Sequence, residues 1–305
     1  MRNDRPSITA SWLAACRALG SLLPDDVRLA HDAYGARFCG RAGEALLAVA
    51  GRAPPLARVL ILAARPWVAY VQARTRAIDD VLLGYLAEGG RQVVILGAGF
   101  DCRAARFADA LAAARVFEVD HAATQARKRV AMAGERQGAI AYLPWDFEAR
   151  PVSELPDALA ALGLDLAGRT LVVWEGVAMY LRADAVEETL AAVHRLGVPG
   201  STVAFTYFEH RRVTRPAMAA VRAAAGVFAR AAGEPFRSGF DPAALAAWLL
   251  PRGFALERDR GEAELAAMLP RVWRGRTRLG EHVAVARTVE RSATRPARAG
   301  KGGSP

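Results

Sequence analysis

The sequence contains very little lysine, although the chain is basic. Its formal net charge is +10 at pH 7, yet lysine occurs only at Lys128 and Lys301, and the remaining positive charge is arginine scattered among many alanines. No basic stripe is interleaved with aromatic residues, so we expect no nucleic-acid partner. The charge is a feature of composition, and residues 288–305 are predicted to form a disordered basic tail.

Cysteine is also scarce, and long apolar runs are missing. Cys16, Cys39 and Cys102 are odd in number and far apart, which predicts neither a disulfide framework nor a metal site and suits a cytoplasmic protein. The N-terminus lacks a signal-peptide pattern, and arginines and prolines interrupt the most apolar stretch, residues 45–71. We therefore expect no membrane span and no membrane partner. The sequence does not indicate an oligomeric state.

A buried-strand pattern leads directly into a glycine turn. The aliphatic run Val93–Leu96 has no polar alternation, as is typical of a central parallel strand covered on both faces. Gly97 and Gly99 follow and carry no Cβ, so the backbone can turn sharply and bring its N–H groups close to a ligand. The next strand pattern ends at Asp120, where a carboxylate can accept both hydroxyls of a ribose.

One position of this turn differs from a dinucleotide-binding turn. Cys102 stands where a third glycine would allow close packing of the helix that binds a pyrophosphate. The residues therefore favour a ligand with a ribose and no pyrophosphate, of which S-adenosylmethionine is the common one. A strand-to-helix turn without a ligand is the alternative.

Strand and helix patterns alternate from Gln92 onward. The alternation predicts an α/β fold with a doubly wound, Rossmann-like, seven-stranded, mostly parallel sheet whose last strand is antiparallel. Asp241 before Pro242 predicts a helix start, and Gly253 predicts that helix's end. Strands are expected over residues 92–97, 115–119, 140–143, 170–175, 201–208, 253–258 and 281–287.

The chain divides into three predicted parts. Residues 1–90 have helical apolar spacing and no strand pattern, so we expect an N-terminal helical segment that covers the ligand site. Residues 91–287 form the predicted core, and the alanine-rich stretch 210–237 is predicted to be a helical lid inserted in it. The tail makes up the remainder.

Five motifs in order resemble one known family. They are Leu96–Asp101, Phe117–His121, Leu143–Phe147, Trp174–Leu181 and Gly233–Phe236. Together they resemble the leucine carboxyl methyltransferase family, and more narrowly its bacterial branch of class I S-adenosylmethionine-dependent methyltransferases, from about Thr9 to Arg287. The resemblance implies a class I methyltransferase fold, S-adenosylmethionine as cofactor, and transfer of a methyl group to an oxygen of a small-molecule acceptor.

The resemblance also assigns roles to residues around the cofactor. It implies that Asp120 holds the ribose hydroxyls and that Asp146 binds the adenine amine, with Phe147 packing near the ring. An aspartate after a strand is also a frequent helix cap. Arg74 is expected to bind the cofactor's carboxylate, because a guanidinium offers paired donors. Arg76 is the alternative.

Further roles follow from the same resemblance. Glu175, at the end of the fourth strand, is expected to pair with the cofactor's ammonium group. Tyr180 faces either the methyl group or the substrate, or serves in packing. Arg17 stands where the family often has a basic residue for the same carboxylate as Arg74. Two departures are Cys102, where threonine is common, and the run that begins at Asp32, Asp32-Ala33-Tyr34, where Asp-Pro is usual.

Histidines are few, and this bears on the acceptor. An ionised carboxylate needs no general base, whereas a phenol or alcohol does. His210 follows the fifth strand and is the best-placed candidate base, whereas His121 and His194 are interpreted as a loop and a helix residue. The sequence shows no carboxylate–histidine pair, so we expect a carboxylate or acidic hydroxyl as acceptor. A nicotinamide-dependent oxidoreductase and a non-catalytic binding module are the competing interpretations.

Overall fold

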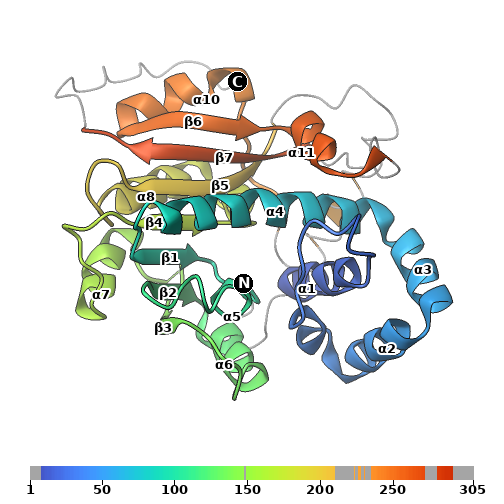
Figure 1. Cartoon of the computed structure of the whole chain (residues 1–305). Coiled ribbons are helices and arrows are strands. Elements are labelled where there is room, and N and C mark those ends of the chain that lie inside the picture. The colour runs from blue at the N-terminus through green and yellow to red at the C-terminus, as the bar shows by residue number, and fades with distance from the viewer. Residues whose placement is uncertain are drawn as a thin grey trace.

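The structure is a computed structural model that describes residues 8–147, 149–209, 223, 226, 227, 230, 235–271 and 280–290. A seven-stranded sheet with the order β3-β2-β1-β4-β5-β7-β6 forms its centre (Figure 1). The strands are β1 Gln92–Leu96, β2 Arg115–Asp120, β3 Ala139–Pro144, β4 Leu171–Trp174, β5 Thr202–Phe208, β6 Phe254–Arg260 and β7 Glu281–Thr288. All seven predicted strands are therefore confirmed, with ends shifted by a residue or two.

Strand pairing confirms the predicted doubly wound sheet. β1 is parallel to both neighbours, with Val93 opposite Val116 on β2 and Leu171 on β4. β7 runs antiparallel to β5 and to β6. The chain turns from β1 to opposite sides at β2 and β4, and open α/β sheets bind their ligands outside the carboxyl ends of the strands at such a point.

Alternating strand residues fill two cores, one on each face of the sheet. On one face Ile95 and Val173 pack with Ile78 of α4 (Arg65–Ala87), and α11 (Glu262–Met268) covers the same face. On the other face Leu96 and Trp174 pack with helices α7 (Leu155–Ala161), α8 (Ala183–His194) and α10 (Pro242–Leu249). Burial on both faces explains why the parallel strands read as continuous apolar runs.

The chain before β1 is helical where predicted. It consists of α1 (Ile8–Ser21), η1 (Gly35–Phe38), α2 (Gly40–Arg52), α3 (Pro54–Ala63) and α4. Figure 1 shows α1, α2 and α3 beyond the carboxyl ends of the parallel strands, and α1 packs against α4. The division of the chain at residue 90 stays a prediction.

Short elements complete the fold. After β1 come α5 (Arg103–Arg106) and α6 (Ala122–Ala131), with η2 (Val152–Glu154), η3 (Ala178–Tyr180) and η4 (Leu250–Arg252) further on. Asp241 caps α10 by accepting the N–H of Ala243 at 3.0 Å, and Gly253 has a φ of 87° after η4, as predicted.

Parts of the predicted organisation fall outside the described residues. Most of the proposed lid, including His210, and the tail after Glu290 belong to these parts. Within the described ranges, none of the helices combines the length and apolar character needed to cross a membrane.

Candidate active site

A cavity lies at the carboxyl ends of β1, β2 and β4. Its wall also includes Leu13 and Arg17 of α1, so the N-terminal helices close it on one side. The structure brings together in this wall all the predicted site residues that it describes: Arg74, Gly97, Gly99, Asp120, Asp146, Phe147, Glu175 and Tyr180. The sequence therefore predicted a set of residues that the fold brings together, while the site and the roles of the individual residues stay predictions.

The glycine turn is built for close contact. Gly97 and Gly99 have φ values of 64° and 47°, a region that side chains with a Cβ rarely occupy. A Cβ on Gly97 would lie 2.3 Å from Cγ2 of Val177. Glycine is required here both by the backbone conformation and by the loop that follows β4.

Asp120 joins this turn to the end of β2. Its Oδ2 accepts the N–H of Gly99 at 2.7 Å and its Oδ1 accepts the N–H of His121 at 2.7 Å. Burial raises the pKa of Asp120, and these two amides offset part of that effect. A carboxylate has about four lone-pair positions, so both oxygens retain acceptor capacity toward the cavity.

The end of β3 contributes Asp146 and Phe147 to the cavity wall. Oδ1 of Asp146 accepts the N–H of Ala149 at 3.3 Å. The aspartate therefore stabilises a turn, and it does not cap a helix as the alternative interpretation expected. Trp145 beside it is buried, and its backbone N–H donates to the carbonyl of Asp120 at 2.9 Å. The backbone thus fixes Asp146 relative to Asp120.

Glu175 is held by two buried guanidiniums. Its Oε2 accepts from Arg103 at 2.7 Å and its Oε1 lies 2.8 Å from Nε of Arg74. Burial acts to raise the pKa of Glu175, but the charges of Arg103 and Arg74 outweigh it and lower the pKa to about 2. The expectation that this glutamate needs a partner is met inside the protein, before any ligand ammonium is considered.

The sequence analysis missed Arg103. This residue also contacts Asp79 at 2.8 Å and Asp101, and it is 3% exposed. Its partners lie in α4, the glycine turn and the end of β4, far apart in sequence. The sequence offered one signal, which is that Arg103 stands between Cys102 and two alanines. A charged side chain among apolar residues needs partners when it is buried.

Arg74 and Arg76 lie in different environments although both belong to α4. Arg74 is 3% exposed, donates to the hydroxyl of Tyr70 at 2.7 Å, and lines the cavity. Arg76 pairs with Asp80 at 2.7 Å, and half of its side chain is exposed. Of the two arginines, only Arg74 is placed where a ligand in the cavity can reach it.

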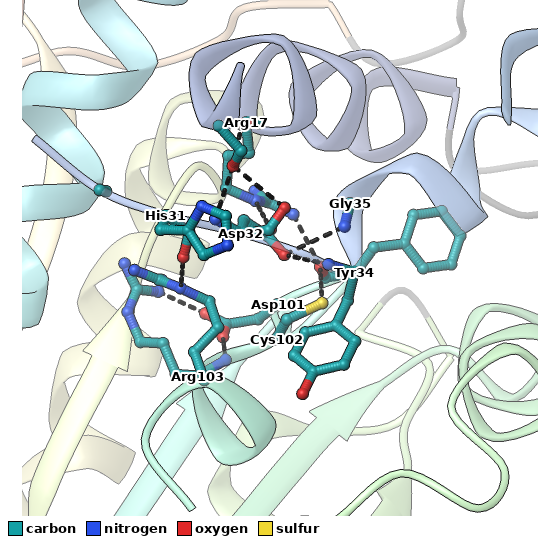
Figure 2. A network of polar contacts seen from close by, with 12 residues as sticks. Arg17, His31, Asp32, Tyr34, Gly35, Asp101, Cys102 and Arg103 are labelled. Atoms are coloured by element: carbon teal, nitrogen blue, oxygen red, sulfur yellow. Dashed lines mark hydrogen bonds and ion pairs between the residues drawn. The ribbon is translucent and has the colours of Figure 1, made fainter. Parts of the chain in front are cut away.

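Arg17 links α1 to the glycine turn (Figure 2). Its Nε donates to Oδ2 of Asp32 at 2.8 Å, and its Nη2 donates to the carbonyl of Phe100 at 2.7 Å. Oδ1 of Asp32 accepts the N–H groups of Tyr34 and Gly35, both at 3.0 Å. The aspartate therefore shapes its own loop where the family's usual proline is missing.

Cys102 lies beneath the same network. It is 3% exposed, as expected of a buried small apolar residue. Burial raises the pKa of its thiol.

The histidines differ from the expectation at one point. His121 begins α6, where its Nδ1 accepts the N–H of Ala123 at 3.3 Å, and His194 ends α8. The sequence shows no carboxylate–histidine pair, but the structure contains one, because Nδ1 of His282 lies 3.0 Å from Oδ1 of Asp259. Antiparallel pairing of β6 and β7 creates this contact, which residue spacing does not reveal. His282 is not among the described residues that line the cavity.

The fold is Rossmann-like, and a cavity lies at the switch point of its sheet. The family model for leucine carboxyl methyltransferase matches residues 10–194. The chain therefore belongs to the leucine carboxyl methyltransferase family.

Individual relatives agree with this assignment. A putative S-adenosyl-L-methionine-dependent methyltransferase of Frankia alni is 40% identical over 136 residues, which cover 44% of this chain and 46% of the relative. One from Parafrankia sp. is 35% identical over 211 residues, 66% of this chain and 61% of the relative. The chain thus spans about half to three-fifths of the length of these curated relatives.

Solved structures support the fold. A DUF574 family protein from Streptomyces avermitilis has a TM-score of 0.57 at 14% identity, with 90% of this chain and 97% of the other covered. A putative methyltransferase from Thermobifida fusca has a TM-score of 0.54 at 16% identity, with 93% and 96% covered. The sheet is accordingly of the class I methyltransferase type.

Proposed function

We propose that this protein is an S-adenosylmethionine-dependent O-methyltransferase that acts on a carboxylate or acidic hydroxyl of a small molecule. The observation that carries the proposal is the cavity formed by the glycine turn, Asp120 and Asp146 at the switch point of the sheet. Family membership and the names of the curated relatives support the same activity.

The residues present fit S-adenosylmethionine. Gly97 and Gly99 carry no Cβ and line the cavity, so a ligand can approach their backbone closely, and the oxygens of Asp120 retain capacity for two hydroxyl donors. Asp146 with Phe147 would hold the adenine, and Arg74 with Glu175 would hold the charged amino-acid end. When bound, the sulfonium supplies an electrophilic methyl group.

The turn fits a dinucleotide poorly. The helix after it, α5, has only four residues, and the N–H of Arg103 at its start already donates to Oδ1 of Asp101 at 2.7 Å. A pyrophosphate needs such N–H groups at the start of a helix. The protein's own carboxylate occupies that position, which disfavours the oxidoreductase alternative.

The chain's part in the transfer is to position the acceptor and to exclude water. Well-oriented groups gain roughly 7 to 11 kcal/mol from proximity alone. Among the described residues of the cavity wall, His121 is the only histidine, and its Nδ1 is used in capping α6. This supports an acceptor that is already ionised at pH 7, since a carboxylate has no proton to lose. Tyr180 lies in the wall and is proposed to face the acceptor.

A calorimetric titration of the whole chain with S-adenosylhomocysteine and with NAD tests this proposal. We expect binding of the first only, and the reverse result would establish the oxidoreductase alternative. Asp120→Ala is expected to weaken S-adenosylhomocysteine binding at least tenfold, because charge-assisted hydrogen bonds contribute about 1.5 to 3 kcal/mol each. Asp109→Ala, an exposed aspartate, serves as the control. Unchanged affinity in a folded Asp120→Ala variant would refute the ribose assignment.

The acceptor is tested by methyl transfer to matched carboxylic acids, phenols and alcohols, repeated with His210→Ala. We expect transfer to acids that survives this substitution, with a rate that is constant above about pH 5 because carboxylic acids are ionised there. Transfer confined to phenols or alcohols and abolished by His210→Ala would show that His210 is a general base. Binding of S-adenosylhomocysteine without transfer to any acceptor would indicate the non-catalytic alternative.

A further inference from the structure

We infer that Arg237 binds the carboxylate of the methyl acceptor, and that the acceptor is an organic acid with an apolar body. This inference rests on the proposed function and specifies its substrate. Arg237 belongs to the segment between β5 and α10, is exposed, and lines the cavity.

The backbone of Arg237 is fixed to the loop after β4. Its N–H donates to the carbonyl of Met179 at 2.8 Å, and the hydroxyl of Ser238 donates to the carbonyl of Ala178 at 2.7 Å. The preceding Phe236 stacks on Tyr180 with ring centroids 5.6 Å apart. These contacts attach Arg237 to the same short element that places Tyr180 in the cavity.

Arg237 differs in its charge environment from the other arginines of the wall. Among the described residues, Arg17, Arg74 and Arg237 supply the guanidiniums that line the cavity. Arg17 is paired with Asp32 and Arg74 with Glu175. No acidic partner of Arg237 occurs in the part of the chain that the structure describes. Among the described residues no carboxylate uses its paired donors, whose geometry matches a carboxylate ligand.

Apolar residues form part of the cavity wall that includes Arg237. Leu13, Tyr180, Leu181 and Pro235 line the cavity, and Leu13 and Tyr180 belong to one apolar cluster with Phe236 and Met179. Asp120 and Asp146, which belong to the proposed cofactor end of the cavity, come from the end of β2 and from the loop after β3. An acceptor that uses this surface has an aromatic or aliphatic body beside its charged group.

The proposed reaction removes the charge that Arg237 recognises. A carboxylate oxygen forms a bond to the methyl carbon while the methyl–sulfur bond breaks, and the electron pair of that bond stays on sulfur. No proton moves, and the product is a neutral methyl ester. Arg237 therefore favours the acid over its ester, which promotes product release.

The experiment measures binding of phenylacetate, octanoate and the methyl esters of both to the whole chain saturated with S-adenosylhomocysteine. We expect at least one acid to bind about tenfold more tightly than its ester. Arg237→Gln is expected to remove this preference while its affinity for S-adenosylhomocysteine stays within twofold. Arg182→Gln is the control, because Arg182 follows the same loop but is exposed and pairs with Asp184.

Three results would overturn the inference. The first is that neither acid is preferred over its ester, and the second is that Arg182→Gln has the same effect as Arg237→Gln. The third is that Arg237→Gln weakens S-adenosylhomocysteine binding, which would place Arg237 at the cofactor's carboxylate. Failure of the unsubstituted chain to bind S-adenosylhomocysteine would instead refute the proposed function, so the two failures are distinguishable.

Discussion

Two carboxylates of this protein, Glu175 in the cavity wall and Glu118 in the interior, have pKa values shifted in opposite directions. Glu175 contacts Arg103 and Arg74, and its pKa is lowered to about 2. Among the described residues, the side chain of Glu118 on β2 pairs with Lys128 of α6, at 2.7 Å, and burial raises its pKa to about 6 in spite of that lysine. One oxygen of Glu118 also has no hydrogen-bond partner among the described residues. The number of charged donors therefore decides whether burial or pairing controls the ionisation of a carboxylate.

Breaking the pair of Glu118 and Lys128 is expected to have the largest effect on the unfolding free energy. Lys128→Met leaves Glu118 buried without a counter-charge, which typically costs about 3–5 kcal/mol of unfolding free energy. Removing both charges in Lys128→Met/Glu118→Leu is expected to restore most of the loss, as replacement of a buried pair by apolar residues often does. Urea denaturation measures both variants, with the exposed Arg129→Met as control. An equal loss in the single and double variants would contradict this account.

Acid titration tests the stronger site. A carboxyl group whose pKa is lowered from 4.5 to about 2 by folding contributes stability that is complete above about pH 4.5 and is lost as pH falls through about 2. The contribution is about 3 kcal/mol at 1.36 kcal/mol per pKa unit. Between pH 4.5 and 2, the unfolding free energy of the unsubstituted chain should therefore fall about 3 kcal/mol further than that of Glu175→Gln. Glu154→Gln, at an exposed glutamate, should follow the unsubstituted chain.

At Glu118 we expect the unfolding free energy to change with pH in the opposite direction, and by a smaller amount. Its pKa rises on folding from 4.5 to about 6, so its contribution is complete below about pH 4.5 and is lost as pH rises through about 6. Relative to Glu118→Gln, the unsubstituted chain should lose about 2 kcal/mol of unfolding free energy over this interval. The difference between the two proteins, measured by urea denaturation at each pH, should be constant above about pH 7. A difference that grows with falling pH would refute the opposite behaviour of the two sites.

The sequence predicted the strands well and the charge networks poorly, and both outcomes have a physical reason. A buried parallel strand such as Val93–Leu96 carries its pattern within a few residues, and the glycine turn and Asp120 follow it directly. The Glu175 network instead joins α4, the turn and β4, and the pair of Asp259 and His282 depends on strand pairing. Such contacts exist only after the chain has folded, so spacing along the sequence does not contain them.

The smallest expected effect is on cofactor affinity, and it distinguishes buried Arg74 of α4 from its exposed neighbour Arg76. Lysine at position 74 keeps the positive charge but offers one head group, so it cannot contact both Glu175 and the hydroxyl of Tyr70 as the guanidinium does. Arg74→Lys is therefore expected to lower the affinity for S-adenosylhomocysteine about tenfold, equivalent to about 1.4 kcal/mol. Arg76→Lys keeps a surface pair with Asp80, and such pairs contribute about 0 to 1 kcal/mol and lie away from the cavity. Its affinity, measured by the same calorimetric titration, should equal that of the unsubstituted chain. If Arg76→Lys had the larger effect, the cofactor's carboxylate would have to be reached from the outer face of α4, and the cavity described here would not be the site of cofactor binding.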